Sequence, residues 1–264
     1  MEIKYTLQGL FIYGAMGAYL FAFIVSILRR EKLGRYIYAT GFILTIAGYG
    51  YRWYHTGHIP MQNLFEVFIT MGILVYPLSI FCRRALKVGA EAFDMLTGVI
   101  VLVPAGFFFS AEPKQLPPAL QCWLFAPHVA VYMISYVLMG KAMIQAIDQL
   151  IGLKPSADGE LVDYEQGTYR MVSFGFPLMT LGLILGSWWG HLAWGDYWGW
   201  DPKELWALVT WLVYLIYLHF RMLYGRRYKM ANSMLAIAGM AAILITLLWA
   251  NLAKLFAGLH SYAM

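Results

Sequence analysis

The sequence predicts an all-α, polytopic integral membrane protein, a helical bundle of about eight transmembrane helices with its N-terminus outside. Hydrophobic residues make up 61% of the 264 residues and charged residues only 12%, whereas charged residues are about 25% of a soluble globular domain. Long apolar segments recur along the chain, and Lys and Arg collect in alternate connections between them. Because backbone polar groups in lipid must bond within their own segment, these segments should be helices.

Eight segments reach or approach the roughly 20 residues that cross a bilayer core. In chain order they are 10–28, 36–51, 63–81, 93–109, 129–147, 172–189, 205–220 and 234–252. Basic residues follow the first segment instead of preceding it, so we expect a helix of the mature protein and no cleaved signal. No repeat or low-complexity tract interrupts the series, which favours a single membrane domain, 1–264.

Polar residues mark the ends of several segments. Glu66 opens the third and Asp94 the fourth, where negative charge suits a helix N-terminus. Lys141 lies in the fifth segment near its inner end, and we expect its side chain to snorkel to the surface. The seventh begins with DPKE, in which Asp201 is the expected N-cap and Glu204 completes a capping box. The proline-rich stretch 110–127 should lie along the outer surface, with one interfacial turn.

The orientation follows from basic residues in the connections. Thirteen Lys and Arg fall on one side: Arg29, Arg30, Lys32, Arg35, Arg83, Arg84, Lys87, Lys154, Arg170, Arg221, Arg226, Arg227 and Lys229. Five fall on the other: Lys4, Arg52, Lys114, Lys203 and Lys254. Since the richer side faces the cytoplasm, the N-terminus should be outside. The net charge of +5 then reflects topology, and we expect no nucleic-acid partner.

Tryptophan is concentrated in one place. Seven of the ten tryptophans fall within residues 188–211, around the motif WGDYWGWDPKE at 194–204. Tryptophans that only anchor helices at the interface would be spread over many helix ends. We therefore predict that an outer loop, 188–204, forms an aromatic surface for a flat ligand. Anchoring remains the alternative for the tryptophans, and capping remains the alternative for Asp201.

Three histidines are candidate metal ligands. His128 opens the fifth segment and His260 follows the eighth, both on the predicted side of the Trp-rich loop. Imidazole is a good axial ligand for haem iron, so these two could clasp one iron, with Trp194, Trp198 and Trp200 as apolar walls.

His219 lies 15 residues after Glu204, about 22 Å along a helix, so it would belong to a separate inner site. The alternatives are a solvated surface residue for His128 or His260 and an interhelical hydrogen bond for His219. The chain has no C-x-x-C motif and is therefore neither a dithiol reductant nor itself a c-type cytochrome.

On these residues the chain resembles the CcsA (ResC) family of system II cytochrome c biogenesis, haem-handling membrane proteins with a tryptophan-rich WWD motif. The likeness is carried by WGDYWGWDPKELWALVTWLVYLIYLH at 194–219, GHIPMQNLFE at 57–66, HVAVYMISY at 128–136 and the C-terminal GLHSYAM. It extends over most of the chain.

The resemblance implies haem transport and presentation for covalent attachment to apocytochrome c, with haem b as the transported substrate. His128 and His260 would be external iron ligands and His219 a ligand of an inner site, while Trp194, Trp198, Trp200 and Asp201 would contact the haem. No catalytic residue is assigned.

The chain would be one component of a holocytochrome c synthase, a thioether-forming lyase, acting with a CcsB (ResB)-like partner on apocytochromes that carry C-x-x-C-H. We expect a bacterial cytoplasmic membrane, with the thylakoid membrane as the alternative and the WWD loop on the outer side.

Other functions stay open at this point. The chain could be a membrane subunit that transfers electrons through resident haem b, although transmembrane cytochromes b place paired ligands inside the bilayer and only His219 lies there. It could be a haem handler similar to CcmC or CcmF of system I, or an assembly subunit whose aromatic loop only docks a partner.

Overall fold

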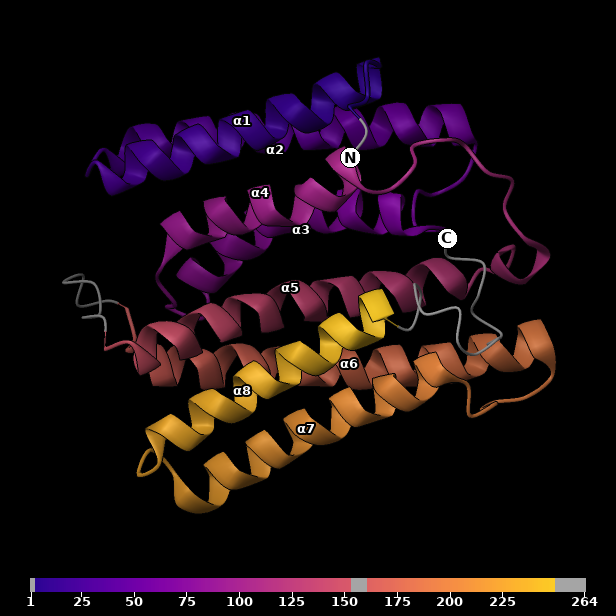
Figure 1. Ribbon diagram of the computed structural model, residues 1–264. Helices are drawn as coiled ribbons and strands as arrows, with labels where there is room; N and C mark the ends of the chain where they lie inside the picture. The colour runs from indigo at the N-terminus through magenta and orange to yellow at the C-terminus, as the bar shows by residue number, and fades with distance from the viewer. Residues whose placement is uncertain (1–2, 153–160, 250–264) are drawn as a thin grey trace. The chain divides into compact units, whose positions relative to one another are not determined.

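The computed structural model describes residues 3–152 and 161–249, and within them it is all-helical (Figure 1). Eight α-helices are present in this part of the chain: α1 Leu7–Ile27, α2 Glu31–Thr56, α3 Leu64–Arg84, α4 Glu91–Phe107, α5 Phe125–Leu150, α6 Tyr164–Trp194, α7 Pro202–Tyr224 and α8 Lys229–Leu244. A short 3-10 helix, η1 Pro118–Leu120, precedes α5, and a π-helical turn, η2 Ile245–Trp249, continues α8. The predicted all-α class is confirmed, with one helix for each predicted segment.

Six of these helices are long and apolar enough to cross a membrane: α1, α3, α5, α6, α7, and α8 extended to Leu248. With 17 residues, α4 spans only about 25 Å at 1.5 Å per residue, and α2 carries charged groups at both ends. The chain is thus a polytopic membrane protein, with six spans by this measure where we expected about eight. An N-terminus on the outside stays a prediction.

The described helices fall into two compact units. Unit 1 comprises Met1–Ile80 and Ala90–Leu116. Here α1 packs on α2 and α4, and the ring of Tyr19 fits between two glycines. A Cβ on Gly41 or Gly98 would lie 2.5 or 2.6 Å from that ring. The Tyr19 hydroxyl also hydrogen-bonds Thr45 at 2.9 Å. Small residues thus allow close approach of helices that have no hydrophobic driving force between them in lipid.

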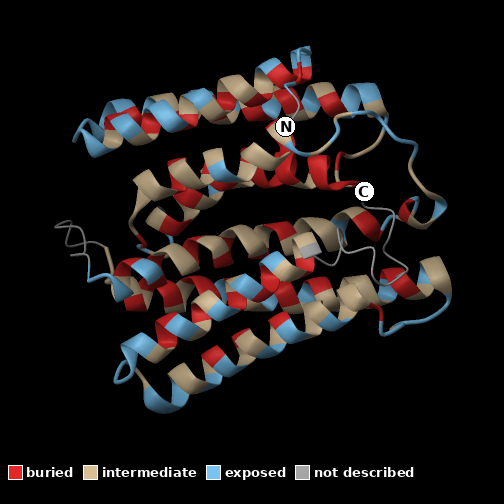
Figure 2. Ribbon diagram, viewed as in Figure 1, coloured by how far each residue is buried: buried red, intermediate tan, exposed pale blue. Residues whose placement is uncertain are grey.

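Unit 2 comprises Phe81–Gly89 and Pro117–Met264. In it α5 packs on α6 and α8, and α7 packs on α6 and α8. Buried residues recur along α5, α6 and α8, whereas α7 is mostly half-buried or exposed (Figure 2). Its buried positions are Thr210, Tyr214 and Tyr217. A single membrane domain over 1–264 stays a prediction.

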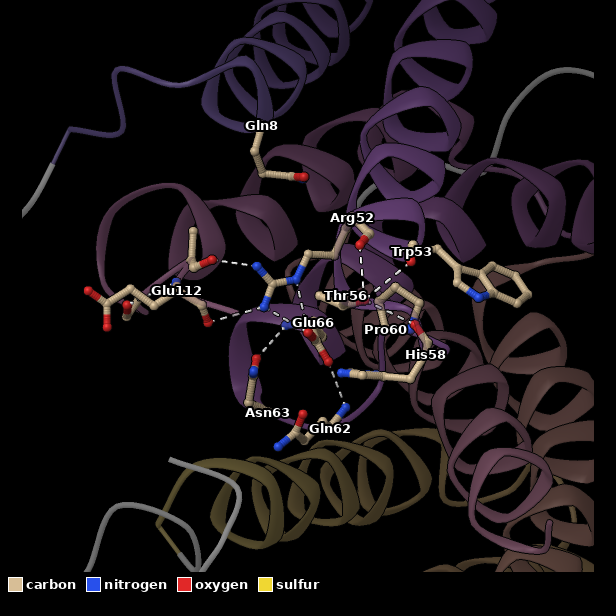
Figure 3. Close-up of polar contacts among 12 residues, drawn as sticks. Gln8, Arg52, Trp53, Thr56, His58, Pro60, Gln62, Asn63, Glu66 and Glu112 are labelled. Atoms are coloured by element: carbon tan, nitrogen blue, oxygen red, sulfur yellow. Dashed lines mark hydrogen bonds and ion pairs between the residues drawn. The ribbon is translucent and has the colours of Figure 1, made fainter. Parts of the chain in front are cut away.

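A buried ion pair organises one end of unit 1 (Figure 3). Arg52 on α2 bonds Glu66 on α3, with Nε–Oε1 2.9 Å apart, and also donates to the carbonyls of Ala111 and Glu112. Glu66 in turn accepts from the backbone N–H of Gln62 at 2.9 Å. The pair therefore holds the end of α2, the start of α3 and the segment after α4. Glu66 lies in the first turn of α3, as predicted, but its ion pair with Arg52 was not predicted.

The prediction that the Lys141 side chain snorkels to the surface is wrong. Its side chain is only 6% exposed and lies inside unit 2, together with the buried Gln145 and Asp148 of the same helix. These residues follow one another at helical spacing, so α5 carries a polar stripe inward. The expected snorkelling does not occur because this face of α5 packs against other helices instead of facing the membrane surface.

Candidate functional site

His128 lies in the first turns of α5, at the end of unit 2 that carries the tryptophans. Its Nδ1 is 2.9 Å from the carbonyl oxygen of Gly182 on α6. A carbonyl can only accept, so Nδ1 carries a proton, and in the neutral imidazole Nε2 then has the lone pair. In metalloproteins, a hydrogen bond from the other ring nitrogen orients histidine ligands in the same way.

A glycine makes room for this ring. A Cβ on Gly186 would lie 2.4 Å from Cε1 and 2.8 Å from Nδ1 of His128. One turn earlier on α6, Gly182 faces the ring of Tyr132 in the same way, with 2.8 Å to the nearest atom. The two glycines therefore form a small-residue face of α6 against which the aromatic face of α5 packs. The four-residue spacing of Gly182 and Gly186 is visible in the sequence and is the signal that could have indicated this face.

Trp189 on α6 connects His128 to the tryptophan motif. Its indole is 2% exposed and lies nearly parallel to the His128 ring, with centroids 5.8 Å apart and planes at 15°. It also contacts Trp194, whose ring centroid is 4.7 Å away at 68°, and its Nε1 donates to the carbonyl of Ala119 at 2.8 Å. Sequence reasoning counted Trp189 in the cluster but assigned it no role.

The loop between α6 and α7 is shorter than predicted. We expected 188–204, but α6 continues to Trp194 and α7 begins at Pro202. Gly195 ends α6 with φ of 90°, a left-handed conformation that suits glycine. The helix continues past residue 188 for two reasons. Trp189 is buried, and the His191 side chain bonds the carbonyl of Gly195 at 2.9 Å, which stabilises the last turn.

Side chains of α6 hold the first half of this loop. His191 stacks on Tyr197 with ring centroids 4.2 Å apart and planes at 5°. Ser187 donates to the Tyr197 carbonyl at 2.8 Å. His191, which we did not predict to be a ligand, thus has a structural role.

Side chains of α7 hold the second half. The Asp201 carboxylate accepts from the N–H groups of Lys203 and Glu204, both at 2.9 Å. Glu204 Oε2 accepts from the N–H groups of Asp201 at 3.2 Å and Gly199 at 2.8 Å. The predicted capping box is confirmed. A contact of Asp201 with a ligand stays a prediction.

Trp198 and Trp200 lie between these two sets of bonds. Their rings meet edge to face, with centroids 5.9 Å apart at 82°. Trp200 is 65% exposed, whereas Nε1 of the half-buried Trp198 is buried without an acceptor in the described part of the chain. The loop therefore displays one indole and retains one unsatisfied donor.

His219 has a different setting. It lies on an exposed face of α7, with Nδ1 2.9 Å from the Leu215 carbonyl of its own helix. It falls in a row of exposed apolar residues, three or four positions apart: Leu205, Val209, Leu212, Ile216 and Leu223. His260 lies outside the described residues.

Comparisons with known proteins identify the family of this chain. Residues 61–257 match the family described as Cytochrome C assembly protein. This chain belongs to that family. The match covers α5 to α8, the tryptophan loop, His128 and His219.

Relatives of this cytochrome c assembly protein carry the name cytochrome c biogenesis protein CcsA, as the resemblance implied. One from a Synechococcus strain is 32% identical over 90% of this chain and 89% of its own length. One from Marchantia polymorpha is 30% identical, covering 80% of this chain and 81% of the relative. The match to the Chlamydomonas reinhardtii protein, 32% identical, spans 80% of this chain but 63% of the relative. A role in cytochrome c biogenesis follows.

Proposed function

We propose that this chain binds haem as a substrate and presents it for covalent attachment to apocytochrome c. The observation that carries the proposal is the setting of His128. Its ring is oriented by the Gly182 carbonyl, stacked on Trp189 and connected through Trp189 to the tryptophan motif.

These residues fit the chemistry of the substrate. The Nε2 lone pair of His128 can ligate iron, and indole faces suit an apolar, flat macrocycle. Haem vinyl groups then form thioethers with the two thiols of a C-x-x-C-H segment. The contribution of this chain is binding and orientation, and no residue is assigned a catalytic role.

The second external ligand in this proposal is His260. It follows α8 in sequence, and α8 packs directly on α5, the helix of His128. Arg52, Lys203 and Lys254, three basic residues on the predicted outer side, are candidates to pair with the haem propionates. Arg52, however, is bonded to Glu66 and two carbonyls. A propionate contact of Lys203 or Lys254 stays a proposal, and Lys254 lies outside the described residues.

The exposed position of His219 favours a partner protein in the membrane, which we propose is a CcsB (ResB)-like protein. An imidazole facing lipid is costly, and the row around it has the three-and-four spacing that helices use to pack on one another. A partner helix over this row would enclose His219 and complete the inner haem site. We place the tryptophan loop on the outer side of the membrane from the basic residues of the opposite connections.

The chain purified with its partner tests this function. Haem content and absorption spectra are compared for wild type, His128→Ala, His260→Ala and His219→Ala, with His55→Ala as control, since His55 is exposed and bonds its own helix. We expect either outer substitution to remove the external haem spectrum and His219→Ala to lower haem content at both sites. Spectra unchanged by both outer substitutions would eliminate the external site.

Deleting the gene separates this function from electron transfer through resident haem. Covalent cytochrome c, seen by haem staining of denatured gels, should disappear in the deletion strain and return with the wild-type gene. Normal staining in the deletion strain would contradict a role in haem attachment.

A further inference from the structure

We propose that Glu204 is a positioning residue that holds Trp200 in a strained backbone conformation, so that its indole stays displayed to the haem substrate. This inference rests on the proposed function for its ligand. The geometry of the loop, however, can be tested without haem.

Trp200 has an unusual backbone conformation. Its φ is 57°, in the left-handed region that residues with a Cβ rarely adopt. The other non-glycine residues with positive φ are Arg29, Lys87 and Ala90 in the described chain, so Trp200 is the one aromatic residue among them. Strained residues that persist are held by their surroundings and are frequent at functional sites.

The exposure of Trp200 is a second distinctive feature. Trp200 is 65% exposed, whereas Trp189 in the same motif region is 2% exposed. Because tryptophan is favourable at a membrane interface, exposure by itself does not fix where this indole points. The backbone conformation at Trp200 sets the direction of its side chain.

Glu204 holds the backbone next to Trp200. Its Oε2 accepts from Gly199 N–H at 2.8 Å and Asp201 N–H at 3.2 Å, and these two residues flank Trp200. A capping box needs only the Asp201 bond. The extra bond to Gly199 fixes the residue preceding Trp200 as well, so one carboxylate oxygen holds the backbone on both sides of the strained residue.

Tyr197 is held independently from α6. Ser187 donates to its carbonyl at 2.8 Å, and His191 stacks on its ring. The segment can therefore not relieve the strain by shifting as a whole. The constraints from α6 and α7 meet at Trp198, and Trp200 lies in the part of the loop that Glu204 holds on both sides.

A double-mutant cycle between positions 204 and 200 tests the proposal, using the chain with its partner. Trp200→Gly should leave the thermal stability of the haem-free protein unchanged or higher, because glycine adopts positive φ without strain, yet weaken haem binding about 3- to 10-fold through the lost aromatic contact. Glu204→Ala should weaken haem binding to a similar extent when Trp200 is present and cause little further loss in the Trp200→Gly background. Glu204→Gln, which keeps an acceptor oxygen, should retain most of the affinity.

Acrylamide quenching of tryptophan fluorescence in the haem-free protein measures the solvent exposure of the Trp200 indole directly. The fluorescence difference between wild type and Trp200→Phe isolates the signal of Trp200, and Glu204→Ala should change its quenching. Thr6→Ala, which removes the N-cap of α1 in unit 1, is the control for loss of a cap alone and should leave this quenching unchanged.

Two results would overturn the inference: a clear loss of stability in Trp200→Gly, or an equal effect of Glu204→Ala on haem binding in both backgrounds. In either case Trp200 is a structural or interfacial anchor and Glu204 only a cap. A wild-type protein that binds no haem would refute the proposed function instead, and the stability and quenching measurements would still decide whether Glu204 positions Trp200.

Discussion

Gly186→Ala should weaken haem binding by about 10- to 100-fold, the range seen when the hydrogen-bond partner of a metal-ligating side chain is lost. The added Cβ would lie 2.4 Å from Cε1 of His128, a distance that real contacts do not reach. The imidazole must therefore move away from α6, and its bond to the Gly182 carbonyl is lost. Because Nδ1 then has no fixed acceptor, neither the tautomer nor the ring direction is set. Haem titration of the purified complex measures the loss.

Gly140→Ala is the matched control. It also adds a methyl group to a helical glycine of unit 2, but the nearest atom would be Met240 Cε at an ordinary 3.9 Å. Helix propensity alone favours alanine by up to about 1 kcal/mol at either position. We therefore expect haem binding to be unchanged in Gly140→Ala. Equal haem affinity in the two variants would show that His128 is not held through Gly186.

Glu66→Ala should lower the free energy of unfolding by about 3–5 kcal/mol, the usual cost of removing one partner of a buried ion pair. The Glu66 side chain is fully buried and that of Arg52 is 4% exposed. Without the carboxylate, the guanidinium keeps the carbonyls of Ala111 and Glu112 and the ring of Phe65, 5.2 Å away, but loses the anion that neutralises it. The Gln62 N–H also loses its acceptor. Thermal unfolding in detergent, followed by circular dichroism, measures the change.

Two further variants distinguish charge imbalance from lost packing. Glu31→Ala removes an exposed partner of Arg35 at 3.5 Å and should change stability by less than about 1 kcal/mol. The double variant Arg52→Met/Glu66→Leu removes both charges and should recover much of the loss. If Glu66→Ala and Glu31→Ala have the same stability, the ion pair does not hold this end of unit 1.

The helices, the capping box and the tryptophan-rich loop could be predicted from the sequence, because each depends on residues that are neighbours along the chain. The apolar segments predicted the eight helices. The spacing of Asp201 and Glu204 predicted the capping box that begins α7. The concentration of tryptophan pointed to the loop between α6 and α7, and the resemblance pointed to the family that the comparisons confirm.

Other features could not be read in this way. The loop proved shorter than 188–204, because the last turn of α6 is stabilised by the burial of Trp189 and the bond between His191 and Gly195. Lys141 is buried, since a sequence does not say which face of a helix meets another helix. Nothing in the spacing of residues 52 and 66 indicated that these two charges would pair.

Local chemistry therefore accounts for where the helices of this protein begin, how apolar they are and where aromatic residues gather, since hydrogen bonding, capping and burial in lipid act over a few residues. The contacts between helices account for the rest. His128 acquires its orientation from Gly182 and Gly186, more than fifty residues away in the chain, and Glu66 acquires its cation from α2. Such pairings depend on how each helix is rotated and which helix it packs against. The helical period of the sequence shows which residues share a face, but not which neighbouring helix that face contacts.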